Sequence, residues 1–196
     1  MKAIILAAGQ GARMGEVTKD IPKPLIKLNN KPILIHQIES LNSNGIKDIS
    51  IVIGFKKDKV KEACKNHKIK FYEFDQFKEK GLIEGLYSAK EELDEDVLLI
   101  YGDVYFEREV ISDLLKEDHD FSIGVDTANK DDPSDKEEVE NYYGVEMKKG
   151  STKVAIDNGF VKDISKKIEK NKISGTYVGI TKMKKVIAIK VRNKIK

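Results

Sequence analysis

The chain reads LAAGQGARMGEVTKDIPKPL over residues 6–25, directly after the short apolar run of residues 3–6. The apolar run predicts a buried β-strand, and the glycines after it predict a loop. Backbone amides of a glycine loop can approach a phosphate closely, so this loop is a candidate anion-binding site. Lys23 lies between Pro22 and Pro24, whose rings restrict the backbone on both sides of the lysine.

Two common phosphate-binding motifs do not fit this loop. A Walker A loop needs Gly-Lys followed by Ser or Thr, which residues 6–25 lack. The dinucleotide fingerprint needs Gly-x-Gly-x-x-Gly, and Met14 stands where the third glycine is required. Considered alone, the loop is as consistent with a plain surface turn as with a phosphate site.

Strand and helix patterns alternate over the first 120 residues. Strands are expected at residues 2–6, 49–53, 69–74 and 97–101. Helices are expected between Pro32 and Gly45 and at residues 56–66, 82–93 and 109–115. This order predicts an α/β fold, a three-layer sandwich with a mostly parallel central sheet, in which the almost wholly apolar segment 97–101 is a central strand.

The pattern changes after Asp120. A further strand is expected at residues 121–125, and the acidic segment 126–141 is expected to be a loop. Short antiparallel strands are expected at 142–147, 152–156 and 160–164, and a late strand at 176–180. We find no internal repeat or low-complexity linker and therefore expect one domain, residues 1–183, followed by a basic C-terminal tail, residues 184–196.

Composition points to a soluble globular protein. Of the 196 residues, 40% are hydrophobic and 35% charged, and the apolar runs are too short to span a bilayer. The N-terminus enters a strand pattern directly, which argues against a signal peptide. The single cysteine, Cys64, precludes an internal disulfide and favours a reducing compartment. We expect a cytoplasmic protein that makes no membrane contact.

The net charge of +3 conceals an uneven distribution of charge. Nine of the 36 basic residues lie in residues 170–196, which contain no acid. The preceding 169 residues therefore carry 27 basic against 33 acidic residues, a net charge of −6. An acidic body does not favour nucleic acid as a partner. The basic end could bind RNA or a membrane surface, but solvated lysines explain it more simply.

The pattern L-A-A-G-x-G-x-R-M followed by P-K-P resembles the start of the sugar-1-phosphate and alcohol-phosphate nucleotidyltransferases. The resemblance implies a Rossmann-like fold of the nucleotide-diphospho-sugar transferase type. It also implies that Arg13 neutralises the leaving pyrophosphate and that Lys23 lies near the α-phosphate of a bound nucleoside triphosphate. The loop residues expected to surround the triphosphate are Leu6, Ala8, Gly9 and Gly11.

Two further segments resemble the same family. Gln76, five residues before Gly81, resembles the family's Gln-x4-Gly motif, in which the glutamine side chain and the glycine backbone contact the base. In GFVKDISKKI, Lys166 takes the place of the lysine that binds the acceptor phosphate, although Ser165 and Lys167 replace the usual Glu and Pro. These departures lean toward the cytidylyltransferase branch.

Asp103 follows the apolar segment 97–101 and Gly102. Carboxyl ends of parallel strands bind ligands in open α/β sheets, so Asp103 and Gly9 are expected at the same end of the sheet. A lone Asp in this place is otherwise a turn or N-cap residue. The resemblance makes Asp103 a magnesium ligand that bridges the nucleotide phosphates.

The implied reaction joins a nucleotide to a phosphate monoester and releases pyrophosphate, with Mg²⁺ as cofactor. Family members usually supply a second metal-binding carboxylate near the C-terminus, whereas here no acid follows Glu169. We therefore expect weak turnover unless another acid, such as Asp157, completes the site. The three histidines share no metal-ligand spacing with Cys64.

Several alternatives stay open at this point. The donor can be CTP, slightly favoured, or UTP or dTTP, and the acceptor a small alcohol phosphate, a phosphonate or a sugar 1-phosphate. The chain can also be a non-catalytic nucleotide-binding protein or an interaction module with a basic tail. Copies of the chain can also form a homo-oligomer.

Overall fold

The structure is a computed structural model that describes residues 1–11, 18–128, 139–142, 145–148 and 151–195, with the backbone alone for 139–142 and 145–148. Arg13 therefore lies outside the described residues. The chain forms two compact units, one of residues 1–122 with 179–196 and the other of residues 123–178. We describe each unit by itself.

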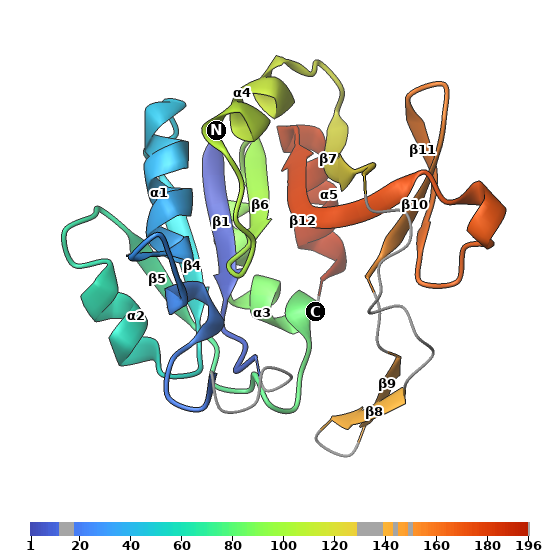
Figure 1. Cartoon of the computed structure of the whole chain (residues 1–196). Coiled ribbons are helices and arrows are strands. Elements are labelled where there is room, and N and C mark those ends of the chain that lie inside the picture. The colour runs from blue at the N-terminus through green and yellow to red at the C-terminus, as the bar shows by residue number, and fades with distance from the viewer. Residues whose placement is uncertain (12–17, 129–138, 143–144, 149–150, 196) are drawn as a thin grey trace. The chain divides into compact units, whose positions relative to one another are not determined.

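The first unit is built on a mostly parallel sheet. Strand β1 (Lys2–Ala7) lies between β4 (Ile49–Ile53) and β6 (Val97–Tyr101), parallel to both, and β5 (Lys70–Glu73) continues the sheet beyond β4. The last residues of β12 (Gly175–Met183) pair with β6 antiparallel, so the sheet is mixed (Figure 1). The predicted strand at 97–101 is thus internal to the sheet.

Helices and short turns connect these strands. The helices are α1 (Ile33–Ser43), α2 (Lys57–Ala63), α3 (Leu82–Ser88), α4 (Arg108–Lys116) and α5 (Lys185–Lys194). The short elements are the 3₁₀ turns η2 (Lys23–Leu25) and η3 (Lys90–Glu92) and the two-residue strands β2 (Lys27–Leu28) and β3 (Lys31–Pro32). No helix among the described residues is long and apolar enough to span a bilayer.

Both faces of the sheet are buried. Side chains of a strand point alternately to its two faces. Ile4 and Leu6 of β1 share a core with Leu86 of α3 and Ala188 of α5. Ile5, which points to the opposite face, is also fully buried, and α1 and α4, which pack against each other, add further fully buried side chains. The predicted mostly parallel sheet with flanking helices is confirmed.

Helix α5 occupies most of the segment that the sequence predicts as a basic tail. Ala188 is fully buried, and the partly buried Ile187, Val191 and Ile195 pack against the same core. The main-chain N–H of Lys185 donates to the carboxylate of Asp96 at 2.8 Å, at the start of the helix. Residues 185–194 therefore cover part of the core of the first unit.

A buried carboxylate lies at the amino ends of the strands. Glu92 is only 3% exposed, and its carboxylate lies 3.0 Å from Lys2 Nζ and 2.8 Å from Lys70 Nζ. The hydroxyl of Tyr72 also donates to it. Burial alone would raise the pKa of Glu92, but the hydrogen bonds from Lys70, Tyr72 and Lys2 outweigh burial and lower its pKa to about 2.

The second unit contains short strands. They are part of β7 (Phe121–Asp126), then β8 (Val139–Tyr142), β9 (Val145–Lys148), β10 (Lys153–Asp157), β11 (Phe160–Ser165) and the start of β12, with the 3₁₀ turn η5 (Lys170–Lys172). Strands β10 and β11 pair as a hairpin whose turn residues Asn158 and Gly159 both have positive φ. This confirms the antiparallel strands predicted at 152–156 and 160–164.

The expectation of one strand over residues 142–147 is wrong. The structure has an antiparallel pair, β8 and β9, on either side of residues 143–144, and β8 lies in the segment 126–141 that was expected to be a loop. Valine and tyrosine favour strands, and Val139 and Tyr142 outweigh the local acidity that led to the loop prediction.

Candidate active site

Lys23 lies in a rigid turn. Pro22 has φ −57° and ψ 141°, and its carbonyl accepts a hydrogen bond from the Leu25 N–H at 2.8 Å. The Ile26 N–H donates to the Lys23 carbonyl at 3.0 Å. Pro22 and Pro24 are both buried. The two prolines thus fix the backbone from which the lysine side chain extends.

The glycine loop packs directly against that lysine. Gly11 has φ +69°, and a Cβ atom there would lie 2.4 Å from Lys23 Cγ, so the aliphatic stem of Lys23 occupies the place of a side chain at Gly11. Thr18, which is buried, donates its hydroxyl to the Gly11 carbonyl at 2.7 Å. A Cβ atom at Gly9 would meet no atom of the described residues within 4 Å. The structure therefore brings together Gly11 and Lys23 as predicted, and adds Thr18, which the sequence did not single out.

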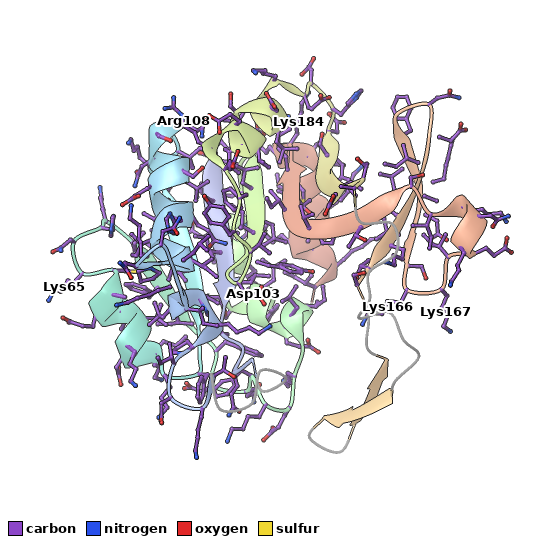
Figure 2. The ribbon with its side chains drawn as sticks, in the orientation of Figure 1. Lys65, Asp103, Arg108, Lys166, Lys167 and Lys184 are labelled. Carbon is purple, nitrogen blue, oxygen red and sulfur yellow. The ribbon has the colours of Figure 1, made fainter. Side chains whose placement is uncertain are left out.

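Asp103 meets Lys23 from the other side of the site. The Lys23 Nζ atom lies 3.1 Å from Asp103 Oδ2, although 80 residues separate the two in sequence. Figure 2 labels Asp103 beyond the end of β6. The side chains are 25% and 40% exposed, and a pair this exposed contributes about 1 kcal/mol or less to stability. The pairing therefore bears on the chemistry of the site more than on the stability of the fold.

Gly102 brings the end of β6 close to the end of β1. Its N–H donates to the Leu6 carbonyl at 2.9 Å, and a Cβ at Gly102 would lie 2.9 Å from the Cβ of Ala7. A side chain at position 102 would therefore push Asp103 away from the glycine loop. The expectation that Gly9 and Asp103 share one end of the sheet is confirmed.

The segment after β5 reaches the same end of the sheet. A Cβ at Gly54 would lie 2.6 Å from the Phe74 carbonyl, 2.8 Å from the Phe77 ring and 2.9 Å from the Ala8 carbonyl. Gln76, next to Phe77, is exposed. The sequence did not single out Gly54, although its place directly after a buried strand is a signal for a close backbone approach.

Gly81 has a structural use of its own. It is the N-cap of α3, and its N–H donates to the Glu84 carboxylate at 3.0 Å, which is the half of a capping box that a glycine can make. The residue is exposed, and a Cβ there would lie 3.3 Å from Glu84 Oε2. A nucleotide base that accepted a hydrogen bond from the Gly81 N–H would therefore compete with the Glu84 carboxylate.

Lys166 belongs to the other unit. It follows β11 directly, is exposed, and lies beside Lys167, whose N–H donates to Ser165 Oγ at 3.0 Å (Figure 2). Arg13 lies outside the described residues.

The donor set at Asp103 fits a Mg²⁺ ion that arrives with a nucleotide. Across the described residues, no group of three or more His, Cys, Asp or Glu side chains could hold a metal unaided. Mg²⁺ is usually held by one or two carboxylates together with substrate phosphates and water. One exposed carboxylate at the end of a parallel strand, next to a lysine, is consistent with that arrangement.

Comparison with known proteins identifies a family of nucleotidyltransferases. The family model described as the MobA-like NTP transferase domain matches residues 3–133. The bifunctional protein GlmU of Methanocaldococcus jannaschii is 38% identical over 117 residues, which are 59% of this chain and 28% of that protein. The CTP:phosphoglutamine cytidylyltransferase of Campylobacter jejuni is 27% identical over 195 residues, 93% of this chain and 72% of that protein.

Solved structures share the fold. The inositol-1-phosphate CTP transferase from T. maritima superposes with a TM-score of 0.76 at 20% identity, over 96% of this chain and 72% of that one. The chain spans only about a third, or less, of the two GlmU relatives matched first. Because the family model covers more than half of the chain, the chain belongs to the family of MobA-like NTP transferase domains.

Proposed function

We propose that the chain is a magnesium-dependent nucleotidyltransferase that moves an NMP group from an NTP, CTP in preference, to a phosphate monoester or phosphonate. The observation that carries this proposal is the meeting of Lys23 and Asp103 beside the glycine loop, at the carboxyl ends of β1 and β6. This is the end of an open parallel sheet where nucleotides bind. Membership of an NTP transferase family supports the reaction class.

The chemistry needs charge placement more than proton transfer. A phosphate monoester has its second pKa near about 6 and is mostly dianionic at neutral pH, so its oxygen is already a nucleophile. That oxygen forms a bond to the α-phosphorus while the bond to the β-phosphate oxygen breaks, and pyrophosphate leaves with the electron pair. We assign Lys23 to the α-phosphate and Arg13 to the leaving pyrophosphate, where preorganised positive charge lowers the barrier.

We assign the remaining contacts by the same reasoning. Leu6, Ala8, Gly9 and Gly11 would surround the triphosphate, Gln76 and Gly81 would contact the base, and Lys166 would bind the acceptor phosphate. Asp103 would hold the Mg²⁺, which neutralises phosphate charge when bound. One carboxylate fixes Mg²⁺ less firmly than two, so we expect turnover to be weak unless Asp157 or a partner's acid supplies a second one.

The preference for CTP is supported by the similar proteins and not by a contact in the structure. Two of the similar proteins described above are named for CTP, one with phosphoglutamine and one with inositol 1-phosphate. The alternative is a sugar-1-phosphate nucleotidylyltransferase that uses UTP or dTTP.

A cytoplasmic location suits a chain whose single cysteine, Cys64, is buried and unpaired.

A pyrophosphate-release screen tests the proposal. CTP, UTP, dTTP and GTP are each combined with choline phosphate, inositol 1-phosphate, aminoethylphosphonate and glucose 1-phosphate, with and without Mg²⁺. We expect release with CTP and an alcohol phosphate or phosphonate, and its loss in Asp103→Asn. Asp113→Asn is the matched control, because Asp113 is 73% exposed on α4 and pairs only with Lys116 among the described residues.

The outcomes separate the competing functions. Release with glucose 1-phosphate and UTP or dTTP would support the sugar-phosphate alternative. Nucleotide binding without release from any pair would favour a non-catalytic nucleotide-binding protein. No binding of any nucleotide at millimolar concentration would contradict the proposal.

A further inference from the structure

Gln37 is a polar residue on the apolar face of α1. Its side chain is 1% exposed, and it lies on the same buried face as Leu34, Ile38 and Leu41. A buried amide in such a place lowers stability unless hydrogen bonds replace those it made to water. The contacts of Gln37 therefore indicate why a glutamine is there.

Both amide hydrogens of Gln37 are used on the turn that carries Asp103. The Nε2 atom donates to the Tyr101 carbonyl at 2.8 Å and to the Val104 carbonyl at 2.6 Å. Only the amino group of the side chain can donate to two carbonyls, so the chemistry also fixes which way the amide faces. Asp103 lies between the two bonded residues, and Gln37 thus bridges the turn from one side of it to the other.

The main-chain hydrogen bond across the turn itself is long. The Val104 N–H reaches the Tyr101 carbonyl only at 3.4 Å, a long hydrogen bond. The Gly102 N–H is tied to Leu6, which sets the start of the turn but not its end. The two short bonds from Gln37 therefore add a direct constraint on the segment around Asp103.

Helix α1 also supports the other half of the ion pair. It packs against η2, the turn that contains Lys23, and the Ile33 N–H at its start donates to the Ile26 carbonyl at 2.9 Å. The same rigid helix therefore braces the backbone of Lys23 and, through Gln37, the backbone of Asp103.

The cost of the arrangement is visible in the unused acceptor. Oε1 of Gln37 is buried and accepts no hydrogen bond from any residue that the structure describes. An apolar side chain of similar size would avoid that loss of hydration but would also leave the two turn carbonyls without their donor.

We propose that Gln37 is a positioning residue that fixes the Asp103 carboxylate for the metal–nucleotide complex. The proposal rests on the proposed function, because it assigns Gln37 a role toward the carboxylate that would hold Mg²⁺. Residues that orient a metal ligand typically change metal affinity about 10- to 100-fold when they are removed. Loss of Gln37 should therefore weaken metal binding more than it weakens the fold.

The test compares the wild type with Gln37→Met, which keeps the volume and removes both donors. Gln37→Glu is the second variant, since a carboxylate keeps the shape but cannot donate when ionised. Ser40→Ala is the matched control, because Ser40 lies one turn further along α1 and its buried hydroxyl has no hydrogen-bond partner within the described part of the chain. Mn²⁺ binding in the presence of CTP, and separately UTP, is followed by electron paramagnetic resonance.

We expect the Mn²⁺ dissociation constant to rise about 10-fold or more in both Gln37 variants and to stay unchanged in Ser40→Ala. Hydrogen exchange of a peptide covering residues 101–106 should quicken in the Gln37 variants only. Pyrophosphate release should need more Mg²⁺ and recover as Mg²⁺ is raised, a response that a merely less stable fold would not give.

The two proposals fail in different ways. A wild type that binds Mn²⁺ with nucleotide, beside folded Gln37 variants that bind it equally well, would overturn the role of Gln37 alone. A wild type that binds neither Mn²⁺ nor nucleotide would overturn the proposed function and this inference with it.

Discussion

Lys23 shows, at the scale of one residue, how a flexible cation is held in place before any ligand arrives. A free lysine loses considerable side-chain entropy when it is ordered. Here the prolines on both sides fix its backbone, Gly11 receives its aliphatic stem, and Asp103 meets its ammonium group. The ordering is completed on folding, so a bound phosphate need not supply it again.

Replacing that lysine should therefore act on rate and leave stability nearly unchanged. Lys23→Ala is expected to slow pyrophosphate release roughly 10²-fold or more, the scale for removing one preorganised stabilising group. Lys27→Ala, at an exposed lysine on β2, serves as control and should keep the wild-type rate. Steady-state release assays and thermal unfolding give the two quantities. Equal rates for a folded Lys23→Ala and wild type would exclude a catalytic role for Lys23.

Gly11 should be intolerant of a side chain for two separate reasons. Its φ of +69° is strained for alanine, and the added Cβ would displace Lys23. Gly11→Ala is expected to lower the free energy of unfolding by about 1 kcal/mol or more and to reduce turnover as much as Lys23→Ala does. Gly9→Ala, with open space around the site, should leave the unfolding midpoint within the range of surface substitutions. Urea unfolding of the two variants measures the contrast, and equal midpoints would contradict it.

Some site residues can be predicted from sequence and others cannot, for a physical reason. Lys23 and Asp103 stand in local motifs next to recognisable strands, so their residue types and neighbours mark them. Gln37 and Thr18 act by hydrogen bonds to backbone carbonyls, and those of Gln37 lie more than sixty residues away. No local pattern marks such a partner, because the fold alone brings it near.

At the scale of elements, α5 is the clearest difference from expectation. The apolar residues Ile187, Val191 and Ile195 recur every four positions, as on one helix face, but the segment 170–196 that contains them has nine basic residues and no acid. The long stems of lysine can cover apolar surface while the charged ends reach water. A charge count therefore describes the solvent side of this helix and misses the side that packs on the core.

Disrupting α5 should unfold the first unit. Ala188→Asp places a carboxylate at a fully buried position in the apolar core. It is expected to lower the free energy of unfolding by about 3 kcal/mol or more. Lys190→Asp, on the exposed side of the same helix, is the control and should cost far less. Circular dichroism melting curves compare the two. An Ala188→Asp protein as stable as the wild type would show that α5 is dispensable for the core.

Strands were easier to predict than the irregular segments between them. Parallel strands buried on both faces read as continuous apolar runs, which is why 49–53 and 97–101 coincide with β4 and β6. The pair β8 and β9 escaped prediction because short strands in an acidic segment carry no such run. Their pairing is set by the partner strand, which the local sequence does not reveal.

For the whole molecule, the buried Glu92 should govern stability in acid. Its pKa in the fold is lowered to about 2 from an ordinary value of 4.5, so the unfolded chain takes up a proton first. The stabilisation is therefore complete above about pH 4.5 and is lost progressively as the pH falls toward about 2. A shift of this size corresponds to a contribution on the order of 3 kcal/mol.

Urea unfolding at pH 7, 5 and 3 tests this pH dependence. We expect Glu92→Gln to be less stable than the wild type at pH 7 and the difference between them to shrink at pH 3. Glu95→Gln is the control, because Glu95 is 54% exposed and makes a weak ion pair, at 3.8 Å, with the N-terminal ammonium. A difference between Glu92→Gln and wild type that stays constant from pH 7 to pH 3 would contradict the assignment.

The placement of that carboxylate has an evolutionary consequence. Lys2 and Lys70 begin their strands, so the group around Glu92 lies at the amino ends, while Lys23, Asp103 and the glycine loop lie at the carboxyl ends. Duplicated copies of such a gene can diverge in ligand preference through loop changes at one end, without first eroding the contacts that keep the protein folded at the other. Changes in ligand preference and the contacts that maintain the fold are thereby separated at opposite ends of one sheet.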